Sequence, residues 1–183
     1  MTQIISTKEA AAINFEKSQN AVEINTERLR VAEISNAVFV ESAKEVQQAL
    51  HVKLSQLVSE CLSAVFDDPY EFIIEIVAKR NTTEAKIRLR RDGHEIDPYS
   101  AGGGVLDVAS LALRLSSLMI EDPNNRRILI MDEPFRCASH SIRGRIASML
   151  DVLQKKFGCQ FIIITHMEEL VTEDAHVVDL RKM

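Results

Sequence analysis

The first 66 residues show the hydrophobic spacing of one long helix. Apolar side chains recur at helical intervals in two registers, at Val31, Ile34 and Val38, and then at Val46, Leu50, Leu54, Leu57, Cys61 and Ala64. In a coiled coil, such a change of register is a stutter. Every glycine and proline lies at Pro69 or later, and strong helix formers dominate before it. The pattern predicts a helix of about 60 residues, about 90 Å long.

A helix of this length predicts an arm that either pairs with another helix or projects from the rest of the protein. The hydrophobic stripe is weak before Val31, where polar residues dilute it: Asn14, Gln19, Asn20 and Asn25. Two or three shorter helices folded on each other are the alternative, although no Gly, Pro or Asn-Gly turn marks a break. We therefore divide the chain into an arm, residues 1–66, and a lobe, residues 67–183.

The lobe begins with the pattern of a β-hairpin. The segments EFIIEIVAKR (71–80) and EAKIRLRRDG (84–93) predict two strands joined by Asn81-Thr82-Thr83. In the second strand Ala85, Ile87 and Leu89 share one face, and the opposite face is basic: Lys86, Arg88 and Arg90. This basic row is either a solvated face or a local contact for phosphate groups.

Helices and apolar strands then alternate to the end of the chain. The pattern predicts a helix near 105–118, a strand ending at Asp132, a helix near 141–157, a strand over 160–165 and a short terminal strand near 176–180. Strands that alternate with helices indicate a parallel sheet with crossover helices. The predicted fold class of the lobe is therefore α/β.

Composition fits one folded, intracellular domain. The chain has 183 residues, with 46% apolar and 27% charged side chains, and its net charge of −5 provides no global basic field for nucleic acid. Its cysteines, Cys61, Cys137 and Cys159, form no C-x-x-C pair, so neither a zinc site nor a disulfide framework is indicated. The N-terminus lacks a secretory signal and no apolar run approaches a membrane span, which predicts a cytoplasmic protein.

The candidate chemistry lies where two predicted strands end. Asp132 and Glu133 follow the apolar run 128–131, at the edge where open α/β sheets bind ligands. Thr165 and His166 end the next strand, and they lie beside Asp132 if the two strands are neighbours. The alternatives are that the acids only begin a loop or cap a helix, and that the histidine is structural.

A glycine-rich segment supplies the third candidate. The stretch SAGGGVLDVASLALRLSSL (100–118) places three glycines directly before an amphipathic helix. Glycines let the backbone approach a ligand closely, and the amide groups at a helix N-terminus attract anions such as phosphate.

Together, the three segments resemble the C-terminal half of an ABC-type ATPase, with its signature motif, its Walker B strand with a catalytic glutamate, and its H-loop. The long helix and the motifs GGGVxDVASxALR and DEPFR narrow the resemblance to SMC-like DNA-repair ATPases of the bacterial SbcC group and to phage relatives. The resemblance covers nearly the whole chain. It implies the C-terminal lobe of an ABC-type P-loop ATPase, preceded by a long coiled-coil helix.

The resemblance also implies roles for single residues. Asp132 would hold Mg²⁺ through water, Glu133 would polarise the water that attacks the γ-phosphate of ATP, and His166 would contact that phosphate or that water. The signature segment would close over the γ-phosphate of a nucleotide held by another subunit, through Ser100, Gly102, Gly103 and Gly104. Arg114 resembles the signature-helix arginine that links the nucleotide state to lobe movement.

Three features depart from the family pattern. No G-x-x-x-x-G-K-[ST] occurs in the chain, so it is expected to bind ATP weakly or not at all by itself. An ungapped alignment puts Gly102 at the place of the signature serine, and Ser100 fits only with an insertion. Ser139 stands where the family has the aspartate of the D-loop.

These features lead to two main hypotheses. In the first, the chain is the C-terminal half of an ATPase that hydrolyses ATP with a P-loop-bearing N-terminal lobe, in a dimer of such assemblies. By analogy, a nuclease subunit and DNA are further partners, the DNA through Lys86, Arg88 and Arg90. In the second, the chain is a non-catalytic mimic that binds and regulates a complete SMC-like ATPase. A degenerate fragment that exposes apolar surface is the third possibility.

Overall fold

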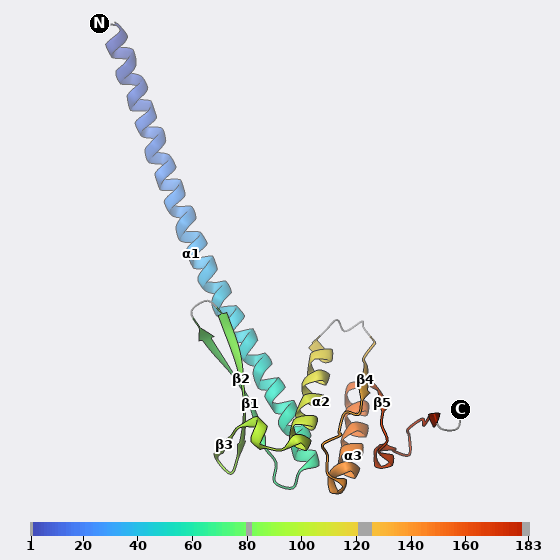
Figure 1. Cartoon of the computed structure of the whole chain (residues 1–183). Helices are drawn as coiled ribbons and strands as arrows, with labels where there is room; N and C mark the ends of the chain where they lie inside the picture. The colour runs from blue at the N-terminus through green and yellow to red at the C-terminus, as the bar shows by residue number, and fades with distance from the viewer. Residues whose placement is uncertain (1, 80–81, 121–125, 181–183) are drawn as a thin grey trace. The chain divides into compact units, whose positions relative to one another are not determined.

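The computed structural model describes residues 2–79, 82–120 and 126–180, and the chain divides into two compact units, residues 1–49 and 50–183. The helix α1, Thr2–Val65, is continuous, so the alternative of two or three shorter helices is not what the structure has (Figure 1). Within the first unit, residues 11–49 are exposed throughout. The length of the helix was therefore predicted correctly, and its hydrophobic stripe at Val31, Ile34 and Val38 faces solvent.

The second unit contains the predicted hairpin, extended by a third strand. The strands β1 (Glu71–Lys79), β2 (Thr82–Arg91) and β3 (His94–Ile96) form one antiparallel sheet in that order. Thr82 and Thr83, which we predicted in the loop, belong to β2, and Asn81 lies outside the described residues. The sequence analysis did not predict β3. Asp92 and Gly93 have φ values of 52° and 77°, as in the tight Asp-Gly turns that join hairpin strands.

The second sheet is the predicted parallel pair. The elements α2 (Gly103–Ile120), β4 (Ile128–Asp132), α3 (His140–Phe157) and β5 (Gln160–Ile164) follow one another along the chain. The strands β4 and β5 pair in parallel, with Ile130 opposite Ile162 (Figure 1). The predicted terminal strand near 176–180 is wrong, since residues 171–180 contain no strand. Val177 and Val178 are exposed there, so the apolar pattern had no sheet to join.

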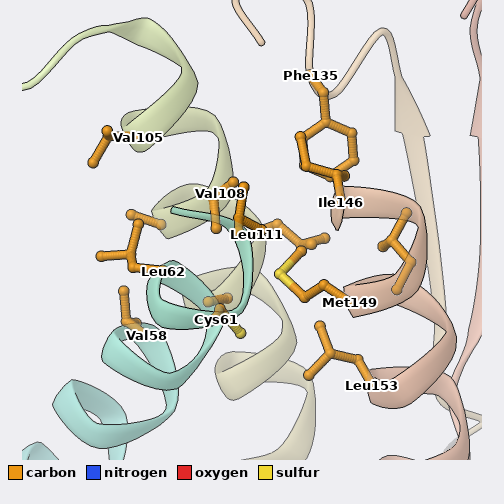
Figure 2. Close-up of a cluster of buried hydrophobic side chains, with 14 of the residues drawn as sticks. Val58, Cys61, Leu62, Val105, Val108, Leu111, Phe135, Ile146, Met149 and Leu153 are labelled. Carbon is orange, nitrogen blue, oxygen red and sulfur yellow. The ribbon is translucent and has the colours of Figure 1, made fainter. Parts of the chain in front are cut away.

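Three helices build the hydrophobic core of the second unit. Figure 2 shows side chains from the last turns of α1, from α2 and from α3 in contact, together with Phe135 from the loop after β4: Val58, Cys61, Leu62, Val105, Val108, Leu111, Ile146, Met149 and Leu153. The end of α1 is also tied to β1, because Ser59 Oγ accepts a hydrogen bond from the Phe72 amide at 2.9 Å. The last turns of α1 therefore pack as part of the lobe.

One described helix, α2, is long and apolar enough to cross a membrane by length and composition alone, with a mean hydropathy of 1.5. This differs from the expectation that no segment would pass such a test. Val108, Ala112 and Leu115 of this helix are fully buried in the core. A helix packed in this way is weak support for a membrane span.

Candidate functional site

The parallel pairing of β4 and β5 brings Glu133 and His166 together. Asp132 pairs with Ile164 in the ladder, and the Glu133 amide then donates a hydrogen bond to the Ile164 carbonyl at 2.9 Å. The Glu133 backbone has a φ of 45°, in the left-handed region that residues other than glycine rarely adopt. Such a conformation costs on the order of 1–3 kcal/mol, and it turns the carboxylate toward the segment after β5.

Both oxygens of the Glu133 carboxylate have partners on that segment. His166 Nδ1 lies 2.8 Å from Glu133 Oε1, and Thr165 Oγ1 donates to Oε2 at 3.2 Å. Thr165 Oγ1 also accepts a hydrogen bond from the Met167 amide at 3.2 Å, which fixes the hydroxyl. The sequence analysis placed Thr165 and His166 beside Asp132, and in the structure their side chains contact the next residue, Glu133.

The hydrogen bond from His166 is the largest influence on Glu133 and lowers its pKa; burial opposes this shift, and the charge of His166 and the hydrogen bond from Thr165 add smaller lowering contributions. Glu133 is therefore ionised at neutral pH and can only accept hydrogen bonds, so His166 Nδ1 carries the proton. Nε2 is then the ring nitrogen left for other partners. Because each carboxylate oxygen accepts more than one hydrogen bond, Glu133 can still bind a water molecule.

Asp132 is exposed at the end of β4, next to this pair. A single carboxylate suits Mg²⁺, which binds through one or two carboxylates together with water and substrate phosphates. The described residues contain no cluster of three or more His, Cys, Asp or Glu side chains that could hold a metal by themselves. Asp132 could therefore contribute to a magnesium site that phosphate groups complete.

The glycine segment lies against the loop that follows Glu133. Gly102 has a φ of 91°, a conformation that favours glycine and that a serine at this position would adopt only with strain. A Cβ atom on Gly103 would lie 2.5 Å from Cys137 Cβ, and one on Gly104 would lie 3.4 Å from the Cys137 carbonyl oxygen. Gly103 is therefore needed for close packing, whereas a Cβ atom on Gly104 would reach van der Waals contact. Ser100 is exposed, at the end of a short 3-10 helix, Pro98–Ser100.

Asp107 joins the same two segments, and the sequence analysis did not single it out. Its Oδ2 accepts a hydrogen bond from the Cys137 amide at 3.0 Å. Burial raises the pKa of Asp107, while this hydrogen bond and the charge of Arg136 oppose the shift. The start of α2 and the loop after Glu133 therefore form one packed unit. Its only signal in the sequence was the place of Asp107 within the glycine-rich motif.

Two of the three basic residues of β2, Arg88 and Arg90, are paired with carboxylates across the sheet. Arg88 contacts Glu75 at 3.1 Å and also Glu95, and Arg90 contacts Glu71 at 3.2 Å. On the opposite face, only Leu89 of the three predicted apolar residues is buried, and Ile87 is 45% exposed. The arrangement supports the solvated-face interpretation of the row more than a phosphate contact.

One face of the β4–β5 sheet is apolar and exposed. Met131 is buried in the core, and Leu129, Phe161 and Ile163 pack against it. Since side chains alternate along strands, the other face carries the exposed isoleucines: Ile130 is 67%, Ile162 is 42% and Ile164 is 55% exposed. Ile130 and Ile162 are directly opposite each other, so these three residues, here called the isoleucine face, form one contiguous patch beside Asp132 and Glu133.

No protein-family model matches the chain. Solved structures share its fold. The chain is similar to a structure from work on ATP-driven dimerisation and DNA-stimulated activation of SMC ATPases, with a TM-score of 0.50 and 17% identity over 69% of this chain and 75% of that one. It is also similar to an SMC head bound to the C-terminal winged-helix domain of ScpA, with a TM-score of 0.52 and 16% identity over 71% of this chain and 39% of that one. The fold is that of an SMC-type ATPase head.

Curated sequences add a short local match to ABC-type ATPases. Spermidine/putrescine import ATP-binding proteins PotA are similar over 60 residues, with 33% identity in Pasteurella multocida and 35% in Aggregatibacter actinomycetemcomitans. The match covers 32% of this chain and only 16% of the length of the Pasteurella protein. The α/β fold class and the likeness to ABC-type heads are therefore confirmed, whereas the SbcC-type specifics remain predictions.

Proposed function

We propose that this chain is the second lobe of an SMC-like ATPase that acts in DNA repair or recombination. Its Walker B carboxylates and H-loop histidine would serve ATP hydrolysis. The observation that carries the proposal is the junction of β4 and β5, where Glu133 adopts a costly backbone conformation and is held by Thr165 and His166. Strain that the surrounding structure maintains at a strand end is typical of functional sites.

In this proposal each group has a physical task. Glu133, ionised and positioned, accepts a hydrogen bond from the attacking water and so orients it. His166 faces the γ-phosphate with Nε2, the ring nitrogen that its contact with Glu133 does not use. Asp132 would hold Mg²⁺ through water, and the bound ion would supply positive charge to the phosphates. Gly103, Gly104 and the start of α2 supply amide groups to a nucleotide bound by another subunit.

The phosphate-binding loop must come from residues beyond these 183, in the same protein or in another, because no G-x-x-x-x-G-K-[ST] occurs among them. The isoleucine face supports a partner of this kind, since an apolar sheet face next to the catalytic carboxylates is suited to packing against a second lobe. Dimerisation of the completed head, a nuclease subunit, DNA contact near Lys86, Arg88 and Arg90, and a cytoplasmic location belong to the same proposal.

The deciding experiment measures ATP hydrolysis by the chain alone and after mixing with a P-loop-bearing lobe from the same source, with and without DNA. We expect turnover only on mixing. Glu133→Gln should lower kcat by about 100-fold or more, as expected for the loss of a positioned base. The matched control is Glu173→Gln, at an exposed carboxylate away from the strand ends, which should retain full turnover. Normal turnover by the Glu133→Gln pair would refute the proposal.

A second candidate is a non-catalytic regulator that occupies the partner surface of a complete SMC-like ATPase. It is favoured by Ser139, which stands at the place of the D-loop aspartate. Ser139 precedes α3 with an extended backbone, as an N-cap residue does, and its Oγ lies 3.0 Å from Ser141 Oγ. Either residue type suits a helix N-cap, but only aspartate carries a charge. A stable complex without turnover, unaffected by Glu133→Gln, would support this second candidate.

A further inference from the structure

Two chain segments follow the parallel strands: residues 133–139 after β4 and residues 165–170 after β5. Both lie near the first turn of α3. Each is anchored in the core close to the strand, because Phe135 is 0% and Met167 only 3% exposed. Farther along, the first segment reaches Ala138 and the second reaches Glu169. A single side chain from α3, that of Arg143, contacts both.

The contacts of Arg143 join these segments laterally. Its Nε donates to the Ala138 carbonyl oxygen at 3.4 Å, and its Nη1 donates to Glu169 Oε1 at 3.2 Å. The side chain is only 23% exposed and that of Glu169 30% exposed, so the pair is partly shielded from water. A planar guanidinium offers donors in fixed directions, and holding two acceptors at once therefore fixes their spacing. His140 lies 2.6 Å from the same Glu169 oxygen, but its side chain is 82% exposed.

We propose that Arg143 is a positioning residue that keeps Glu133 against His166 by holding the Ala138 carbonyl and the Glu169 carboxylate at a fixed separation. The Glu133–His166 contact joins the two segments next to the sheet, and Arg143 joins them a second time at their far ends through Ala138 and Glu169. Without Arg143, the strand end stays held to Glu133 by the Ile164 carbonyl and by the side chains of Thr165 and His166, but the far end at Glu169 keeps only the exposed His140 among the side-chain partners described above. The inference rests on the proposed function in one respect, that Glu133 and His166 are the reacting pair.

The chain provides a matched control two residues along the same helix. Arg145 also bridges a main-chain carbonyl and a carboxylate, since its Nη1 donates to the Val65 carbonyl at 3.1 Å and its Nη2 to Asp67 Oδ2 at 3.0 Å. Its partners lie at the end of α1, away from the two catalytic segments. Arg143→Ala and Arg145→Ala therefore remove comparable contacts from α3, and only the first removes the contacts that join the two segments.

The test reads the imidazole of His166 by nuclear magnetic resonance. The full chain is labelled with ¹⁵N-histidine, the His166 signals are assigned from their loss in His166→Gln, and the Nδ1 and Nε2 shifts are compared at one fixed pH. We expect Arg143→Ala to move the His166 shifts toward those of free imidazole. Arg145→Ala should lower the Tm by a similar amount and leave those shifts unchanged. Glu169→Gln, which keeps an acceptor oxygen but loses the charge, should move them in the same direction by less.

Unchanged His166 shifts in both Arg143→Ala and Glu169→Gln would overturn the inference, and so would an equal change in Arg145→Ala, which would show a general loosening of α3. If Arg143→Ala does not fold, Glu169→Gln decides alone. In a reconstituted ATPase, Arg143→Ala should lower kcat by about 100-fold with little change in KM, as a displaced catalytic group does. The His166 shifts do not depend on turnover, so the inference and the proposed function can fail separately.

Discussion

At the scale of single residues, the site depends on close packing that the sequence only partly reveals. The glycines at 102–104 were predicted to approach a ligand, and the structure adds that Gly103 and Gly104 lie against Cys137 and Ala138. Asp107, Arg143 and Glu169 were not predicted, because each acts on a residue 26 or 30 positions away in the chain. A single sequence carries no periodic pattern that reveals such contacts. The pairing of neighbouring strand ends, in contrast, could be predicted from the alternation of apolar strands and helices.

Substitution of Gly103 should show this packing directly. A Cβ atom there would lie 2.5 Å from Cys137 Cβ, so Gly103→Ala should destabilise the protein by about 1–3 kcal/mol, as overpacking does. When combined with Gly103→Ala, Cys137→Ala keeps the clashing Cβ and should not restore stability, whereas Cys137→Gly removes that atom and should restore part of it. Gly144→Ala is the control: its Cβ meets nothing within 4 Å inside α3, and it should stabilise by about 0.4–1 kcal/mol. Urea unfolding measures all four variants, and a neutral Gly103→Ala would contradict the prediction.

The buried thiol of Cys61 should make stability depend on alkaline pH. Burial raises the pKa of Cys61 from its ordinary value of 9.0 to about 11, with a smaller contribution from Glu60. The folded protein therefore keeps this proton longer than the unfolded chain. The contribution is fully present below pH 9 and is lost as the pH rises toward 11, by on the order of 2–3 kcal/mol.

The difference in unfolding free energy between wild type and Cys61→Ala, measured from pH 8 to 10.5, isolates this effect because the other titrating groups are common to both proteins. The difference should shrink as the pH rises. Cys137→Ala, at an exposed cysteine, should keep the pH dependence of the wild type. A difference between wild type and Cys61→Ala that stays constant with pH would mean that the thiol is not protected by burial.

At the scale of elements, the sequence correctly predicted the helices and strands that have a long, regular hydrophobic period. It did not predict the short strand β3, and it wrongly predicted a terminal strand that has no partner. The helices α1, α2 and α3 and the strands β4 and β5 follow from long, regular apolar patterns, and their parallel pairing follows from the alternation of strands and helices. The three residues of β3 are too few for a period. The predicted strand near 176–180 had an apolar pattern but gained no partner, which shows that a strand exists only where another strand can complete its hydrogen bonds.

Truncation should separate the two parts of α1. Residues 11–49 are exposed, whereas Val58 and Leu62 are 0% exposed in the core of the second unit. A fragment of residues 50–183 should therefore unfold at the same urea concentration as the full chain. A fragment of residues 67–183 loses these side chains, each worth about 2–5 kcal/mol, and should not fold stably. A much less stable 50–183 fragment would show that residues 1–49 stabilise the second unit.

At the scale of the whole molecule, the most telling feature is the isoleucine face. Three exposed isoleucines on a two-stranded parallel sheet are unusual, because parallel sheets are covered on both faces in most proteins. The sequence could predict apolar strands, but not which of their faces is covered by helices of the same chain.

The isoleucine face should cause the isolated chain to self-associate. Ile130→Thr/Ile162→Thr keeps the β-branched shape and removes apolar surface, so it should reduce self-association in sedimentation velocity without lowering the Tm. It should also weaken binding of the P-loop-bearing lobe. Ile87→Thr, at an exposed isoleucine of the other sheet, is the matched control and should change neither property. Equal behaviour of the two variants would exclude the isoleucine face as the interface.

The isoleucine face also bears on how much of the protein a cell can maintain. Chaperones bind exposed apolar strands and proteases degrade the chains that carry them. A chain whose isoleucine face stays exposed is therefore removed, whereas one whose face is covered by a partner persists. The amount of this protein would then follow the supply of the lobe that covers it, whatever the rate at which it is synthesised. In the proposed ATPase, two lobes made as separate chains would in this way be kept in equal number without any regulation of their genes.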